Sequence, residues 1–189
     1  MTIKYTARSG RIYFLHVAPG SKGKVKYFFS TKGEGPLAQV IPEGYEIYEN
    51  VNAQVFLRRK VVQIIRDDEI TLVQKALLKH AETWRYKAEI KKNMIVIHQA
   101  CKDYDWVSTS IPWLDESKME ERKKENTRYM PVMRFILADG ERRLFAPERY
   151  CFRGNIDDWI TIGCGAAPLG KLAKKYIKHL GRDSFYELI

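Results

Sequence analysis

Turn residues interrupt the chain at short intervals, between runs of β-branched and aromatic side chains that have the length of single strands. The clearest interruption is Asp139-Gly140, the strongest short turn signal in the chain, which separates the runs 133–138 and 142–145. Runs that are closed by Gly, Pro, Asn or Asp favour strands that pair with their neighbours in sequence. The sequence therefore predicts mainly antiparallel sheet built from hairpins.

The other expected strands are distributed along most of the chain. They are rich in Ile, Val, Tyr and Phe, the residues that pack best on a pleated surface. The predicted strands are 3–7, 12–16, 25–30, 45–48, 54–58, 86–90, 94–99, 133–138, 142–145 and 159–162.

Two segments place apolar residues at helical spacing. The first begins at Asp67 or Asp68, whose carboxylates can accept hydrogen bonds from the free amides of a first turn, and continues to Trp84. The second covers 169–180, between Pro168 and Gly181, which suit a helix start and a helix stop. The fold class that follows is α+β, with one central helix and one C-terminal amphipathic helix.

The length of 189 residues and the hydrophobic content of 45% are typical of a soluble globular protein with a core of its own. We expect a single domain, 1–189, with a β-rich part at about 1–66 and a C-terminal hairpin plus helix at about 129–189. The segment at about 102–128 mixes acids and bases without an apolar face, so we expect a mobile loop or a solvated helix there.

Positive charge is concentrated near the N-terminus. The formal net charge is +10, and residues 1–66 carry eleven Lys or Arg against four Glu. An excess of this size favours a polyanionic partner, nucleic acid first. The alternative is that the acidic block at 34–57 pairs with the flanking basic strands within one sheet.

The candidate residues for polyanion binding come from two basic blocks of this N-terminal part. The first block is Lys22, Lys24 and Lys26, and the second is Arg58, Arg59 and Lys60. Strand alternation places Lys24, Lys26 and Phe28 on one face, and Val25, Tyr27 and Phe29 on the other. Contacts of this kind bind phosphates, do not depend on the nucleotide sequence, and weaken as the salt concentration rises. Neutralisation of the second block by Glu43, Glu46 and Glu49 would argue against the hypothesis.

Two further hypotheses remain open beside this non-catalytic binding protein. A small enzyme would have a cleft beside the 102–128 loop, lined by His98, Cys101, Asp103 or Asp105. A protein–protein interaction module would use Trp106 and Trp113. The sequence does not fix the oligomeric state.

We expect no metal and no cofactor. His98 and Cys101 have the spacing of a zinc pair, but Cys151 and Cys164 are too far apart in sequence to form a second short pair. The stretch 165–171 has the spacing of a phosphate-binding loop, but it contains Pro168, which removes one of the amides needed to bind phosphate. A glycine-containing strand-to-helix turn is the simpler interpretation.

The cellular compartment is predicted from the small number of cysteines and from the lack of long apolar segments. Three cysteines are too few, and odd in number, for a disulfide framework. The first residues lack the apolar stretch of a secretory signal, and no apolar run has the length of a membrane span. We therefore expect a cytoplasmic protein.

Overall fold

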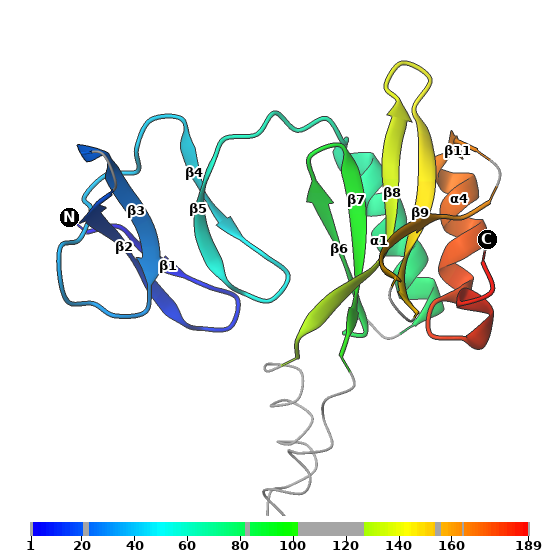
Figure 1. Cartoon of the computed structure of the whole chain (residues 1–189), viewed down its shortest axis with the longest axis horizontal. Coiled ribbons are helices and arrows are strands. Elements are labelled where there is room, and N and C mark those ends of the chain that lie inside the picture. Colours follow the sequence, from blue (N-terminus) through cyan, green and yellow to red (C-terminus); the bar gives the residue numbers. More distant parts are fainter. Residues whose placement is uncertain are drawn as a thin grey trace, which may run out of the picture. The chain divides into compact units, whose positions relative to one another are not determined.

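The computed structural model describes residues 2–20, 23–81, 84–101, 127–153, 156–163 and 165–188. The chain divides into two compact units, unit 1 (Met1–Val61) and unit 2 (Val62–Ile189), whose elements are labelled in Figure 1. The prediction that 1–189 form a single domain stays a prediction. The segment predicted as a loop or solvated helix at 102–128 lies outside the described residues, apart from Thr127 and Arg128.

Unit 1 consists of a three-stranded sheet and a hairpin, all antiparallel. The sheet has the order β1-β2-β3, formed by β1 (Lys4–Thr6), β2 (Ile12–Pro19) and β3 (Val25–Ser30). The hairpin pairs β4 (Tyr45–Glu49) with β5 (Val55–Arg59), as its sequence predicts.

The inner faces of the sheet and the hairpin meet in the small core of unit 1. Leu15 is fully buried and lies opposite Phe29 on the inner face of the sheet, and Val55 is buried on the hairpin. Strand β3 contacts β5, and the Tyr5 hydroxyl donates a hydrogen bond of 3.0 Å to Glu49 on β4. The unit therefore has two layers, each with one inner and one outer face.

Unit 2 is a meander of antiparallel strands with a helix before it and a helix after it. The sheet order is β10-β9-β8-β7-β6, and β11 pairs with β9. The strands are β6 (Tyr86–Lys91), β7 (Met94–Ala100), β8 (Tyr129–Asp139), β9 (Leu144–Arg153), β10 (Ile156–Thr161) and β11 (Ala167–Pro168). The helices are α1 (Asp67–His80) and α4 (Leu169–Tyr176), followed by the 3₁₀ turns η2 (Ile177–His179) and η3 (Asp183–Phe185). The predicted α+β class is confirmed.

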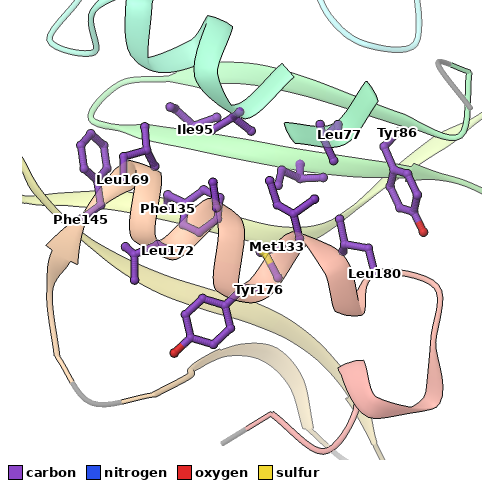
Figure 2. Close-up of a cluster of buried hydrophobic side chains, with 14 of the residues drawn as sticks. Leu77, Tyr86, Ile95, Met133, Phe135, Phe145, Leu169, Leu172, Tyr176 and Leu180 are labelled. Atoms are coloured by element: carbon purple, nitrogen blue, oxygen red, sulfur yellow. The ribbon is translucent and has the colours of Figure 1, made fainter. Parts of the chain in front are cut away.

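One face of this sheet carries the main hydrophobic core (Figure 2). Ile95 and Met133 are fully buried on neighbouring strands, and Leu77 of α1 and Leu172 of α4 pack against that face. The apolar spacing of each helix therefore has a structural reason: one side of each helix is buried on the sheet, and the other remains open to solvent.

The helix ends differ in detail from the sequence prediction. Helix α1 starts at Asp67, but the side chain that accepts from a free amide at its start is Glu69, 2.8 Å from the backbone nitrogen of Arg66. The predicted helix 169–180 changes to a 3₁₀ turn after Tyr176, and Gly181 follows with φ +74°. The α-helix thus ends at Tyr176 and the 3₁₀ turn at His179, so the prediction of one helix up to residue 180 is wrong at its C-terminal end.

Candidate functional site

The first basic block lies at the start of β3. Lys24 and Lys26 are exposed, and neither forms an ion pair with any described residue. Lys26 lies opposite Ala18 on the outer face of the sheet, and Phe28 follows two residues later on the same face. Lys22 lies outside the described residues.

A stacked pair of rings lies on the same outer face. The ring of Phe28 stacks on that of His16, with centroids 5.2 Å apart and an interplanar angle of 14°. His16 is buried, and its Nε2 hydrogen bonds with the carbonyl oxygen of Lys32 at 2.9 Å, whereas Phe28 remains 40% exposed. The outer face that carries Lys24 and Lys26 thus also presents the Phe28 ring, whose orientation is fixed by its stacking on His16.

The second basic block, at the end of β5, is only partly neutralised. Arg58 Nε donates to Glu46 at 2.8 Å, and its guanidinium lies 4.0 Å from the centroid of the Tyr48 ring. Arg59 and Lys60 are exposed and form no ion pair among the described residues. Of the three acids expected as neutralisers, Glu46 alone forms a described ion pair with this block.

Glu49 does not neutralise the second basic block among the described residues but binds Arg8 and Tyr5. Its carboxylate accepts from Arg8 Nε at 2.9 Å and from the Tyr5 hydroxyl at 3.0 Å. Burial of the carboxylate opposes its ionisation, but these hydrogen bonds outweigh burial and lower the pKa of Glu49. It therefore joins the two layers of unit 1 and leaves the second basic block unneutralised.

The two basic blocks do not form one continuous patch. Strand register places Lys26 on the outer face of the three-stranded sheet and Arg58, together with Glu46, on the outer face of the hairpin. The core of unit 1 lies between these faces. The register thus separates Lys26 from Arg58, whereas Arg59 lies at the end of β5 on the face of the hairpin that carries Val55.

The residues of the enzyme hypothesis are only partly described. Asp103 and Asp105 lie outside the described residues, and so do Trp106 and Trp113 of the interaction hypothesis. His98 is buried on β7, with its Nε2 3.7 Å from Glu89 on β6. Burial, followed by the charge of Lys91, lowers the pKa of His98 to about 4, so the imidazole is neutral at neutral pH. Both hypotheses stay predictions.

The structure also bears on the metal and phosphate sites that the sequence suggests. The described part of the chain contains no cluster of three or more His, Cys, Asp or Glu side chains that could hold a metal ion. The stretch 165–171 contains strand β11 and the start of α4, which confirms the strand-to-helix turn.

Sequence reasoning missed a groove in unit 2, between α1 and α4. Two of its lysines, Lys174 and Lys178, belong to a lysine face that is visible in the sequence, but Lys75 and Lys79 of α1 line the same groove. The signal available in the sequence was the spacing of four between the lysines of each pair. The sequence does not show that α1 and α4 lie side by side.

Comparison of the chain with known protein families, with curated proteins and with solved structures found no match. In the described ranges, no helix is both long enough and apolar enough to cross a membrane.

Proposed function

We propose that this protein is a non-catalytic binding protein whose partner is a polyanion, with nucleic acid as the class. The observation that carries the proposal is the set of exposed cations in unit 1 that no described acid neutralises: Lys24, Lys26, Arg59 and Lys60. Unit 1 holds ten Lys or Arg against four Glu. Glu46 and Glu49 are already held by Arg58 and Arg8.

The outer face of the three-stranded sheet adds a second kind of contact. Phe28 is half-exposed beside Lys26 and is held in place by its stack on His16. Proteins that hold single strands combine lysines along the phosphates with rings on which bases stack. We infer that single-stranded nucleic acid binds there with little sequence preference. A cytoplasmic location fits such a partner and the low cysteine count of the chain.

Fluorescence titration of labelled single-stranded DNA and RNA, at low and at physiological salt, tests the proposal. We expect affinity to fall steeply with salt. Replacing Lys24, Lys26, Arg59 and Lys60 by Gln removes up to four phosphate contacts, and the slope of log K against log salt should decrease by roughly 3. The control changes four exposed cations of unit 2 to Gln: Lys92, Arg142, Lys171 and Arg182. Absence of binding at low salt, or an equal loss in the control variant, refutes the proposal.

A further inference from the structure

Helices α1 and α4 run parallel to one another and enclose an open groove. At one end, a Cβ placed on Gly170 would lie 3.6 Å from Cδ1 of Leu72. At the other end, Nε2 of His80 hydrogen bonds with the carbonyl oxygen of Leu180 at 2.9 Å. The order of these contacts along both helices fixes the parallel direction. The groove between them has a volume of about 970 Å³.

Each rim of this groove carries two lysines. Lys75 and Lys79 line it from α1, and Lys174 and Lys178 line it from α4 and the turn that follows. Residues four apart lie roughly 6 Å apart along a helix axis and on the same side of it. All four side chains are exposed, and none forms an ion pair within the described ranges. The groove thus has two pairs of positive charges facing one another.

The floor between the lysines is apolar. It is formed by Leu72, Ala76, Ala173 and Ile177, with Gly170 at one end. Leu72 remains 38% exposed although it lies in this floor. Small residues at the floor allow another backbone to approach closely. Asp67 and Asp68 lie at the end where both helices begin, so the positive charge is concentrated toward the His80 end.

We propose that this groove receives an acidic amphipathic helix of a partner protein. Its apolar stripe would cover the floor, and carboxylates spaced by four would meet the lysines on the rims, away from Asp67 and Asp68. A phosphate backbone would satisfy the lysines but would leave Leu72 and the rest of the apolar floor in water. Charge and floor together therefore favour a protein helix over nucleic acid. The site lies in unit 2 and is independent of the proposed function of unit 1.

Fluorescence anisotropy of a synthetic peptide tests the proposal on the full chain. The probe is a labelled peptide of about 18 residues, long enough to form a helix in water. It has a Leu and Ala stripe on one face and Glu at spacings of four on the other. A peptide of the same composition in scrambled order keeps the charge but loses the stripe. We expect the scrambled peptide to bind at least about tenfold more weakly.

Matched variants locate the contact. Lys174→Glu should weaken peptide binding at least about tenfold, whereas Lys171→Glu on the same helix, outside the groove, should change it less than about threefold. Leu72→Ser should weaken binding at least about threefold, whereas Leu78→Ser, also exposed on α1 but outside the groove, should leave it unchanged. Circular dichroism verifies that all four variants fold like the parent.

Several results would overturn the proposal. Equal affinity for the ordered and the scrambled peptide, or no effect of Leu72→Ser, would mean that charge alone attracts the peptide. A single-stranded oligonucleotide that loses affinity on Lys174→Glu, while the peptide does not bind, would assign the groove to nucleic acid. Failure of the peptide test leaves the proposed function of unit 1 untouched, because that function is tested separately by the variant at Lys24, Lys26, Arg59 and Lys60.

Discussion

Glu69, in the first turn of α1, is bound by Arg143, the last residue of the β8–β9 turn. Nε of Arg143 donates to one carboxylate oxygen at 2.8 Å, and a second guanidinium nitrogen donates to the other oxygen. The backbone nitrogen of Arg66 donates to the same carboxylate at 2.8 Å. The side chains of Glu69 and Arg143 are only 10% and 19% exposed. One carboxylate therefore both caps α1 and fastens it to the end of a sheet hairpin.

Replacement of this carboxylate by an amide should destabilise the fold. Glu69→Gln keeps the size of the side chain but loses the charge that the two donors require, so we expect a loss of about 2 kcal/mol in the free energy of unfolding. Urea unfolding followed by tryptophan fluorescence measures it. The control is Glu141→Gln, because Glu141 is exposed in the β8–β9 turn and forms no ion pair with a described residue. A loss in Glu69→Gln no larger than in this control would contradict the assigned role.

The same interaction predicts a dependence on pH. Burial opposes ionisation of Glu69, but the hydrogen bonds from Arg143 and from the Arg66 amide outweigh it, so the pKa of Glu69 is lowered. A lowered folded-state pKa contributes stability above the unfolded-state pKa, and this contribution is lost as the pH falls through the folded-state value. The difference in stability between the parent and Glu69→Gln should therefore be largest near neutrality and should shrink below about pH 4.

The fold was predictable where local signals determine it. The apolar spacing of α1 places Val73 and Leu77 in the core. Asp139-Gly140 marks the position of the β8–β9 hairpin, but the turn covers residues 140–143, so β9 starts at Leu144 and not at Arg142. Strand β9 extends beyond its predicted end because long-range pairing with β8 and β10 continues through Arg149. That arginine is buried and donates to the carbonyl oxygens of Tyr186 and Leu188 at 3.0 and 2.9 Å. No local pattern shows that the C-terminal backbone will supply these acceptors.

The candidate sites were predictable to a smaller extent, for the same reason. The pairing of Arg58 with Glu46 follows from hairpin register and can be derived from the sequence. The ion pair between Arg8 and Glu49 joins the two layers of unit 1 and cannot be derived from the sequence. The lysine spacing of α1 is visible in the sequence, but only the parallel packing of α1 and α4 turns Lys75 and Lys79 into the rim of a groove.

His98 provides a second, separate pH prediction. Its pKa is lowered from 6.5 to about 4, chiefly by burial. The unfolded chain therefore takes up a proton below its ordinary pKa that the folded chain does not, and stability is lost as the pH falls from 6.5 toward 4. We expect His98→Gln to reduce the loss of stability between pH 7 and pH 5 by about 2 kcal/mol.

Two measurements check this prediction. Urea unfolding at the two pH values gives the loss of stability in the parent and in His98→Gln. Titration of the imidazole carbon-bound protons by NMR follows His98 directly, and its resonances should move only slightly between pH 7 and pH 5. Movement with a midpoint near the ordinary value of 6.5 would show that the imidazole is not shielded as its burial implies.

Substitution of two glycines before α4 distinguishes the cost of backbone strain from the cost of a steric clash. Gly163 and Gly165 have φ of +77° and +81°, where any other residue is strained by about 1–2 kcal/mol. A Cβ at Gly163 would lie 1.9 Å from the hydroxyl oxygen of Tyr176, whereas a Cβ at Gly165 would meet nothing within 4 Å. The Tyr176 ring is buried and packed by α4 against the sheet (Figure 2), so it cannot move aside without loss of core contacts. Gly165→Ala should therefore cost about 1–2 kcal/mol, and Gly163→Ala roughly 2 kcal/mol more. Urea unfolding of both variants measures the difference, and equal losses would show that Tyr176 does not confine Gly163.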